Sequence, residues 1–310
     1  MSKEFTPLFS GGSGRSGTTI IVNLFKHHPE IHSSLPREIK YLTSRYGLLD
    51  LNFGRSLQLE ESFKGRRNNL AARVMALLGQ KGQEQFLNDL QTKWWSETGK
   101  KGKPRGLVQG ITPEQLQLLI KEFQASSQSD LFKASQDLYF GLSRAQIKKQ
   151  EVRYFIDSTP VNCMHSHNIT KLLPGARFIN MIRDGRDVAL SVSKEKWGPN
   201  DAYSALQWWG NRVLMAHQSL AQIPADQRVD IRLEALIQFD RQGQYEKILT
   251  FLKISDSAPM RKFFDQEMLP VHMSQGSWRE QVKDPSSFDR QYDSILSRLA
   301  HNGISIEKFY

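Results

Sequence analysis

The chain has a single cysteine, Cys163, among 310 residues. It can therefore form no internal disulfide and no cysteine-rich metal site, and we expect a reducing compartment such as the cytoplasm. It also lacks the run of about 20 apolar residues that a membrane-spanning helix requires, and its first residues lack the pattern of a secretory signal. With 39% hydrophobic and 24% charged residues, the composition excludes disordered, collagenous and coiled-coil proteins.

The chain has fewer acidic than basic residues. The 42 Lys and Arg residues outnumber the 32 Asp and Glu residues and give a net charge of +10, which favours an anionic ligand without identifying it. More than half of the excess lies between Glu61 and Arg105. Two interpretations stay open for this segment: a solvated helical face, or a surface that attracts an acidic acceptor or a polyanion. Its basic residues are Lys64, Arg66, Arg67, Arg73, Lys81, Lys93, Lys100, Lys101, Lys103 and Arg105.

Strand and helix patterns alternate along the chain. This alternation predicts an α/β fold, a single domain over residues 1–310 with a parallel sheet flanked by helices, and ligands at the carboxyl ends of its strands. Residues 46–150 are mostly helical in pattern, interrupted by a Gly/Lys-rich loop at 99–106, and we interpret them as a helical insertion. The expected strands are 6–10, 31–34, 152–156, 176–182 and 229–233; the expected helices are 16–28, 164–173, 186–194, 201–220 and 245–252.

A glycine-rich loop at residues 12–19, GSGRSGTT, lies between a predicted strand and a predicted helix. Such a loop points successive backbone N–H groups at one anion, and the helix N-terminus adds a favourable dipole. The loop is P-loop-like, but Thr18 occupies the lysine position of a Walker A motif and the cation is Arg15. Because a nucleotide hydrolase needs that lysine, we expect a 5′-phosphate that carries something other than a triphosphate. The expected binding residues are Gly14, Arg15, Ser16, Gly17, Thr18 and Thr19.

A second strand-to-helix transition carries Arg183 at the end of an apolar strand and Ser191 about two turns into the next helix. Both side chains are candidates for one phosphate above the sheet. The spacing is a weak signal by itself. Together with the first loop, it indicates a nucleotide phosphorylated at two positions.

These motifs resemble those of the sulfotransferases that use 3′-phosphoadenosine 5′-phosphosulfate (PAPS). The RSGTT of residues 15–19 is similar to the family's 5′-phosphosulfate loop, and Arg183 with Ser191 is similar to its 3′-phosphate motif. The bacterial and Golgi-type branches are the most similar, and the resemblance covers most of the chain except about 46–150, which we expect to set acceptor specificity. It implies PAPS as donor and adenosine 3′,5′-bisphosphate (PAP) as product. Further similar segments are 156–162, 173–179, 232–236 and 276–279.

Glu38 follows the second predicted strand, in the sequence Arg-Glu-Ile-Lys. In the carbohydrate and tyrosyl-protein branches of the family a glutamate at this place is the general base, so the resemblance implies that role for Glu38. A positioned carboxylate accelerates proton transfer about 10²–10⁴-fold. The alternative is a surface salt bridge of Glu38 with Arg37 or Lys40. We prefer Glu38 to His165 and His167, whose spacing does not match the histidine of the cytosolic branch.

The chain departs from the family pattern in two places. The glycan branch commonly has a lysine before Thr-Pro, where this chain has Ser158. Lys40 and Arg15 are therefore candidates to stabilise the leaving group. The C-terminal R-K-G contact to the 3′-phosphate is also missing, and Arg279 is the candidate replacement.

The expected function is sulfuryl transfer from PAPS to a hydroxyl or amine of a small molecule, glycan, lipid or peptide, with Glu38 and Arg15 catalytic and without a metal. The alternatives are a P-loop-like nucleotide kinase or hydrolase, and a non-catalytic protein that binds a polyanion. No nucleic-acid-binding motif is present. We expect Cys163 to be an inert buried thiol. Four tryptophans are expected to pack in the core or to line the acceptor cleft: Trp94, Trp95, Trp208 and Trp209.

Overall fold

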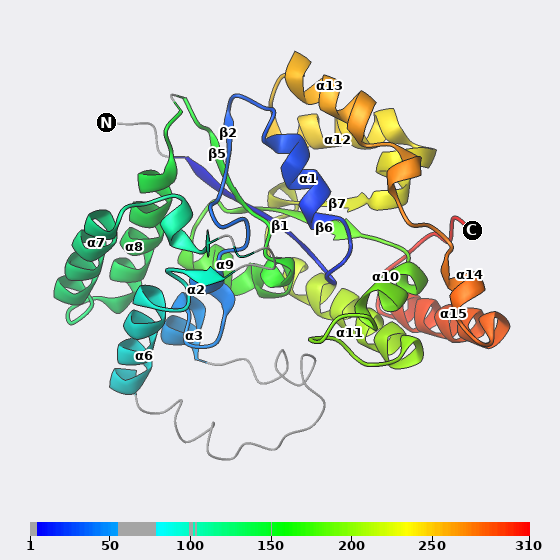
Figure 1. Cartoon of the computed structure of the whole chain (residues 1–310), viewed down its shortest axis with the longest axis horizontal. Helices are drawn as coiled ribbons and strands as arrows, with labels where there is room; N and C mark the ends of the chain where they lie inside the picture. The colour runs from blue at the N-terminus through cyan, green and yellow to red at the C-terminus, as the bar shows by residue number, and fades with distance from the viewer. Residues whose placement is uncertain (1–4, 55–78, 99–101, 103, 150) are drawn as a thin grey trace. The chain divides into compact units, whose positions relative to one another are not determined.

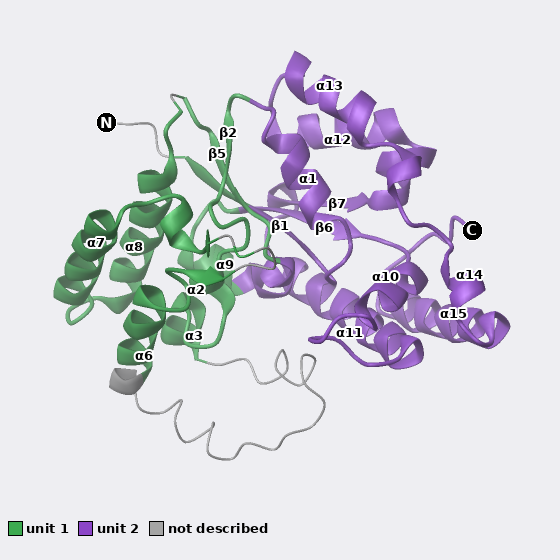
Figure 2. Ribbon diagram, in the orientation of Figure 1, with its two compact units in different colours: residues 1–8, 29–159, 168–176 green, residues 9–28, 160–167, 177–310 purple. Residues whose placement is uncertain are grey.

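The computed structural model describes residues 5–54, 79–98, 102, 104–149 and 151–310. The chain divides into two compact units (Figure 2). Unit 1 comprises residues 1–8, 29–159 and 168–176, and unit 2 comprises residues 9–28, 160–167 and 177–310. The expectation of a single domain over the whole chain stays a prediction.

Five strands form a sheet in the order β2-β5-β1-β6-β7. They are β1 (Thr6–Gly12), β2 (Ile31–Ser33), β5 (Tyr154–Asp157), β6 (Arg177–Ile182) and β7 (Arg228–Arg232). In unit 1, β2 and β5 pair in parallel with Ile31 beside Tyr154. In unit 2, β6 and β7 pair in parallel with Phe178 beside Arg228. The predicted parallel sheet flanked by helices is therefore confirmed.

Helices cover both sides of the β6–β7 pair in unit 2. Figure 1 shows α1, α12 and α13 on one side and α10, α11 and α15 on the other. The helices are α1 (Thr18–Phe25), α10 (Gly185–Val192), α11 (Ala202–Leu220), α12 (Arg241–Leu252), α13 (Ala258–Glu267), α14 (Trp278–Gln281) and α15 (Pro285–His301); shorter turns are η2 (Pro160–His165), η3 (Ala225–Gln227), η4 (Ala235–Phe239) and η5 (Pro270–His272). The sequence did not predict α13 and α15.

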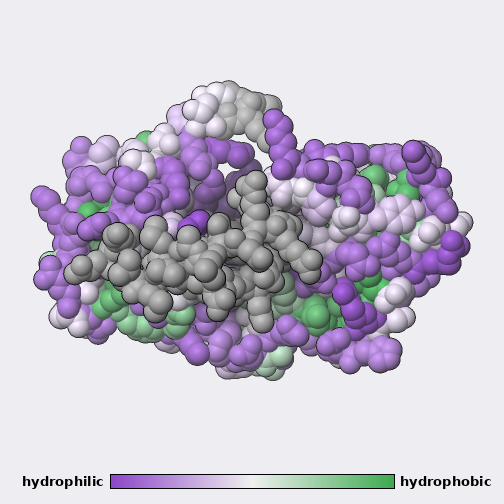
Figure 3. Space-filling view, turned by 90° about the horizontal axis from the view of Figure 1, so that it is seen from below, coloured by the Kyte–Doolittle hydropathy of each residue, from purple (hydrophilic) through white to green (hydrophobic). Residues whose placement is uncertain are grey.

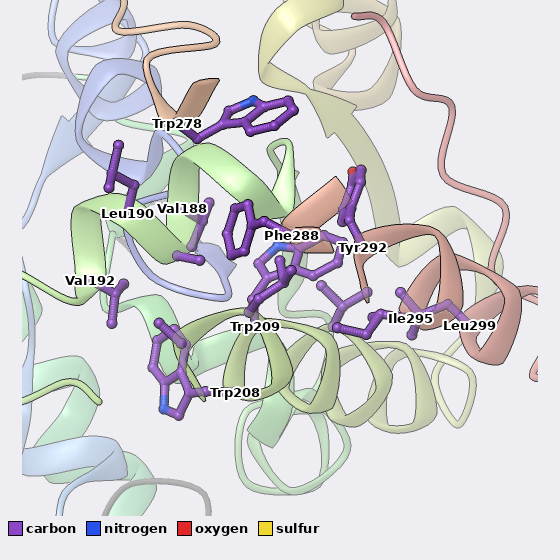
Figure 4. Packing of buried hydrophobic residues seen from close by; sticks show 14 of the residues in the cluster. Val188, Leu190, Val192, Trp208, Trp209, Trp278, Phe288, Tyr292, Ile295 and Leu299 are labelled. Carbon is purple, nitrogen blue, oxygen red and sulfur yellow. The ribbon is translucent and has the colours of Figure 1, made fainter. Parts of the chain in front are cut away.

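A cluster of buried apolar side chains joins α10, α11, α14 and α15 (Figure 4). Trp209 is fully buried beside Phe288 and Tyr292, whereas Trp208 lies at the margin of the cluster (Figure 4). Trp94 is buried in unit 1. The packing prediction is thus confirmed for these three tryptophans, while Trp95 is partly exposed.

Unit 1 is mainly helical beside its two-strand pair. Its elements are α2 (Lys40–Thr43), α3 (Leu48–Phe53), α6 (Gly79–Gln91), η1 (Leu107–Gln109), α7 (Pro113–Ser126) and α8 (Leu131–Gln146); the residues of α9 (Ser166–Leu172) are divided between the two units. In α8, Ala134, Leu138 and Leu142 recur every four residues and form one buried face. Thr112 caps α7 in a capping box with Gln115. The predicted helical region is thus confirmed in its described part.

The segment predicted as a Gly/Lys-rich loop at 99–106 contains a strand, which corrects that prediction. Strands β3 (Glu97–Thr98) and β4 (Pro104–Arg105) form a short antiparallel hairpin in unit 1, with Glu97 beside Arg105. Two-residue strands are too short to show a period in the sequence. Most of the basic segment falls outside the described residues, including Lys64, Arg66, Arg67, Arg73, Lys100, Lys101 and Lys103.

The surface is largely hydrophilic, as a mean hydropathy of −0.50 leads one to expect. On the face that Figure 3 shows, hydrophobic residues form small separate patches. Across the described ranges, every helix is too short or too polar to traverse a bilayer.

Gly185 tests the packing of α10 on α11. A Cβ atom at this position would lie 2.5–2.7 Å from carbon atoms of the Trp209 ring. We expect Gly185→Ala to lower the free energy of unfolding by about 1–3 kcal/mol in urea denaturation, because the core cannot accept the extra methyl group. The matched control is Gly82→Ala in α6, whose Cβ would meet Leu51 at an ordinary 3.5 Å. This control should be neutral or stabilising by up to about 1 kcal/mol, and equal effects of the two variants would contradict the packing argument.

Candidate active site

The loop between β1 and α1 has the backbone shape of an anion cradle. Gly12, Gly14, Arg15 and Gly17 all have positive φ angles, of 155°, 91°, 55° and 98°. Repeated left-handed residues turn successive N–H groups toward the same side. Gly17 is the N-cap of α1 and supplies no capping side chain. The first N–H groups of the helix are therefore available to an anion.

Close packing explains why glycine stands at both ends of this loop. A Cβ atom on Gly12 would lie 2.4 Å from the carbonyl oxygen of Met181, and one on Gly17 would lie 2.8 Å from Cδ1 of Leu233. Both neighbours belong to or directly follow strands of the sheet. Larger residues would thus push the loop away from the strand ends, in addition to the strain at positive φ.

The structure brings together the two segments that the sequence singled out as anion sites. Nε of Arg15 donates a hydrogen bond to Oγ of Ser191 at 2.8 Å, although the two residues are 176 positions apart. Nη1 of Arg183 donates to the carbonyl oxygen of Arg15 at 3.1 Å. Arg15 thus contacts both members of the second segment. All of these residues belong to unit 2.

Two buried polar atoms in this region lack a hydrogen-bond partner. Oγ of Ser16 is buried and has no hydrogen-bond partner among the described residues, and the same is true of Nε of Arg183. Burial of an unpaired polar atom costs about 1–3 kcal/mol, and a bound phosphate would supply the missing acceptors. Thr18 and Thr19 begin α1, Thr18 buried and Thr19 exposed. The residues present therefore fit a phosphorylated ligand.

Acidic residues and the C-terminal segment position the helix that carries Ser191. Asp184 caps α10 by accepting from the N–H of Arg186 at 2.9 Å, and its own N–H donates to Glu234 at 2.8 Å. The fully buried Arg186 pairs with Asp184 and with Asp289. Burial raises the pKa of Glu234. Asp184 and Arg186 are close in the sequence, but Glu234 and Asp289 are distant from them in the chain, so the sequence did not show the network as a whole.

The segment around Gly276 packs against the same place. Arg183 donates to the carbonyl oxygen of Ser274, and the N–H of Gly276 donates to Asp187 at 3.2 Å. Burial raises the pKa of Asp187. Arg279 stacks on the ring of Trp278, with its Cζ 4.5 Å from the ring centroid. Its suggested contact with a 3′-phosphate stays a prediction.

Glu38 lies in unit 1, in a loop. The backbone on either side of Glu38 forms hydrogen bonds with residues at and just after the end of β5. Oδ1 of Asp157 accepts from the N–H of Ile39 at 3.0 Å, and also from the N–H and the hydroxyl of Thr159 at 2.9 and 2.7 Å. Ser158 donates from its N–H and its hydroxyl to the carbonyl oxygen of Arg37, at 2.9 and 3.1 Å. The residues before and after Glu38 are therefore fixed, while Glu38 itself is an exposed residue whose carboxyl group is partly desolvated by its surroundings.

The charges around Glu38 include a residue that the sequence did not link to it. Desolvation of the carboxyl group raises the pKa of Glu38, and the nearby charges of Lys40, Arg105 and Arg37 act in the opposite direction. Arg105 comes from the β3–β4 hairpin. Lys40 pairs with Glu97 of the same hairpin at 2.6 Å. Lys40 thus has a carboxylate partner on the hairpin, and the alternative of a surface salt bridge between Glu38 and Arg37 or Lys40 stays a prediction.

The histidine and cysteine candidates lie in η2 and at the start of α9. Burial, together with the charge of Arg212, lowers the pKa of His165 to about 4, so the imidazole is neutral near pH 7. Cys163 is fully buried, and burial raises the pKa of its thiol, which confirms the expected inert cysteine. Among the described residues, no three His, Cys, Asp or Glu side chains are grouped so that they could hold a metal ion.

A parallel sheet whose first strand ends in a glycine-rich loop before a helix defines a P-loop-like α/β fold. Within this class, the model of the sulfotransferase family matches residues 7–258. The chain therefore belongs to the sulfotransferase family. No curated protein sequence matches it.

Several solved sulfotransferase structures are similar to this chain. The sulfotransferase domain from the curacin biosynthetic pathway is 14% identical with a TM-score of 0.52, over 97% of this chain and 99% of that one. The sulfotransferase domain of the Synechococcus PCC 7002 olefin synthase is 15% identical with a TM-score of 0.48, over 99% and 96% of the two chains. Sulfotransferase STF9 from Mycobacterium avium is 13% identical with a TM-score of 0.49, over 99% and 78%. The first of these supports the shared fold.

Replacing Asp157 tests whether it holds the loop that carries Glu38. Asp157→Ala removes the acceptor of three donors, so we expect the free energy of unfolding to fall by about 2–3 kcal/mol in urea denaturation. Asp157→Asn keeps a carbonyl oxygen and should lose less. The control is Asp137→Ala in α8, which removes only an exposed pair with Lys133 and should cost at most about 0.5 kcal/mol. A similar small cost for Asp157→Ala would show that the three hydrogen bonds do not stabilise the loop.

Proposed function

We propose that this sulfotransferase moves the sulfuryl group of PAPS to a hydroxyl or amine of its acceptor. Membership of the family establishes sulfuryl transfer in general. The observation that carries the choice of donor is the contact of Arg15 with both Ser191 and Arg183. PAPS has anionic groups at two positions of one nucleotide, and these two cationic segments of the chain are in contact.

In this proposal the loop 14–19 binds the 5′-phosphosulfate, and Arg183 with Ser191 binds the 3′-phosphate. The left-handed turns of the loop supply N–H groups, and Arg15 supplies a full charge. Arg183 and Ser191 meet the 3′-phosphate with a guanidinium and a hydroxyl, the two donor types suited to it. PAPS brings an activated S–O bond, and the protein supplies position and charge.

Glu38 acts as the general base. It accepts the proton of the acceptor hydroxyl as the acceptor O–S bond forms and the S–O bond to the 5′-phosphate breaks. The electron pair of that broken bond stays on the phosphate oxygen, where Arg15 stabilises the charge that develops in the transition state. Lys40 is the second candidate for this electrostatic role, although in the structure it pairs with Glu97.

The alternatives have less support. Thr18 in place of the Walker A lysine disfavours a nucleotide kinase or hydrolase. A polyanion-binding role would use the basic segment 61–105. Among the described side chains of this segment, Lys93 forms an ion pair with Asp89, and the positive charge of Arg105 acts to lower the pKa of Glu38. We retain a cytoplasmic location, for which the single buried cysteine is the support.

Calorimetric titration with PAP and with ADP tests the donor site. We expect PAP to bind at least about tenfold more tightly, because ADP has no 3′-phosphate for Arg183. Arg183→Ala should weaken PAP binding about 10–100-fold, the range for lost hydrogen bonds to a charged group, and should weaken ADP binding less, because ADP has no 3′-phosphate. The control is Arg290→Ala on α15, an exposed arginine of the same unit. Equal affinities for PAP and ADP would contradict the proposal.

Glu38→Gln tests the base. We expect kcat to fall about 10²–10⁴-fold with PAP affinity unchanged, since the amide cannot accept the proton. Only the ionised carboxylate is active, so kcat of the wild type should fall as the pH drops through the Glu38 pKa. Because desolvation raises this pKa, that limb should lie above the ordinary glutamate range.

Glu122→Gln in α7 removes one exposed carboxylate and serves as the control for the Glu38 experiment. It should have the kcat and the pH profile of the wild type. A Glu38→Gln enzyme with an unchanged pH profile would exclude Glu38 as the base.

A further inference from the structure

The segment 307–310 is attached to other parts of unit 2 along its whole length. Arg232 of β7 donates a hydrogen bond to the backbone oxygen of Glu307. The ammonium group of Lys308 pairs with two carboxylates of α15, each at 2.9 Å. The ring of Phe309 stacks on a ring of η4, with the two centroids 4.7 Å apart. The segment therefore has a defined course along unit 2, and this course brings its last residue to α10.

Tyr310 contacts the first turn of α10. Its hydroxyl donates a hydrogen bond to Oδ2 of Asp187, and its backbone oxygen accepts one from Nη2 of Arg186 at 2.5 Å. The centroid of its ring lies 5.3 Å from Cζ of Arg186 and 5.6 Å from Cζ of Arg279. Both distances are within the range of cation–π contacts. The ring is therefore held independently of its hydroxyl.

Asp187 links Tyr310 to the segment 274–276. The same oxygen atom, Oδ2, also accepts a hydrogen bond from the N–H of Gly276 at 3.2 Å. Asp187 is only 3% exposed, so water cannot readily replace a lost donor. Burial raises the pKa of Asp187, and the hydrogen bond from Tyr310 acts in the opposite direction. Burial also raises the pKa of the Tyr310 hydroxyl, which therefore remains a donor at ordinary pH.

The segment 274–276 also sets the direction of Arg183. Nη2 of Arg183 donates to the carbonyl oxygen of Ser274, and Nη1 donates to that of Arg15. A guanidinium group is planar, so these two hydrogen bonds fix its plane. The third nitrogen, Nε, is buried and has no hydrogen-bond partner among the described residues. A shift of the segment would therefore turn the guanidinium away from its present direction.

We infer that Tyr310 is a positioning residue for Arg183. Its hydroxyl holds Asp187, which in turn holds the N–H of Gly276. The carbonyl oxygen of Ser274, two residues earlier, then holds the guanidinium of Arg183. All of these residues belong to unit 2. The inference rests on the proposed function, in which Arg183 binds the 3′-phosphate, and it assigns to one hydroxyl a part of the preference for PAP over ADP.

Tyr310→Phe tests the inference, because it removes the hydroxyl and keeps the ring that the two arginines contact. Calorimetry should show PAP binding weakened about three- to tenfold, the scale of one hydrogen bond, and ADP binding changed by less than about twofold. The preference for PAP over ADP should therefore fall. A general loss of folded protein would instead reduce the binding of both nucleotides to the same extent.

The Arg183→Ala background tests whether the hydroxyl acts through Arg183. Substitutions that act through one shared contact are not additive. In the double variant, Tyr310→Phe should change PAP binding by less than about twofold relative to Arg183→Ala alone. A contribution of Tyr310 that bypasses Arg183 would persist in this background at its full size.

Hydrogen exchange gives a second readout, without any nucleotide. In Tyr310→Phe the amide of Gly276 should exchange about three- to tenfold faster, because Asp187 loses the donor that holds it in place. The matched control is Tyr203→Phe, which removes a tyrosine hydroxyl that donates to the carbonyl oxygen of Asp284 at 3.1 Å in the same unit. The control should retain the PAP affinity and the Gly276 exchange rate of the wild type.

Three binding results would overturn the inference: wild-type PAP affinity in Tyr310→Phe, an equal loss of PAP and ADP binding, or a full effect in the Arg183→Ala background. An unchanged exchange rate at Gly276 would overturn it as well. A wild type that binds PAP no more tightly than ADP would contradict the proposed function, a separate result. The exchange rate at Gly276 would still show whether Tyr310 holds the segment.

Discussion

The contact of Arg15 with Ser191 and Arg183 is the interaction on which the candidate donor site depends. It joins a loop near the N-terminus to a helix that begins at Gly185, and both follow strands of the sheet. Arg15 has a positive φ angle, which costs free energy in a residue with a side chain. The packing of Gly12 and Gly17 against the strand ends holds the loop in this shape. Arg15 thus combines a strained backbone with a charged side chain, and the packing of the neighbouring glycines keeps it in this conformation.

Glu38, the proposed base, is held in place in a different way. In unit 1 the backbone around Glu38 is fixed by Asp157 and Ser158, while Glu38 itself is exposed and its partly desolvated carboxyl group lies near three cations. A base needs this combination, because its position must be constant while its proton must come and go. The neighbouring hairpin pairs Glu97 with Lys40. It also contributes Arg105, whose charge, like those of Lys40 and Arg37, acts against the rise in the pKa of Glu38.

The sequence predicted the elements whose signals are local. Strands β5 and β6 are apolar runs in the sequence, and the glycine-rich segment predicts the turn between β1 and α1. The helix α1 is shorter than the predicted 16–28, since Gly17 in a left-handed conformation delays its start to Thr18. Helix α15 went unpredicted although Asp284 and Pro285 mark its N-terminus in the way that capping rules describe. The role of Asp157 could not be read from the sequence, because it acts on Ile39, 118 residues away.

The packing of Cys163 has a practical consequence. Its sulfur lies against Gly11 beneath the loop, where a Cβ on that glycine would be only 2.6 Å away. The thiol is shielded and stays protonated at ordinary pH. Reagents that modify cysteine should therefore not react with Cys163 in the folded protein. A cysteine introduced at the surface would then be the one reactive thiol, so a fluorophore or spin label could be attached at a chosen place without first removing the native residue.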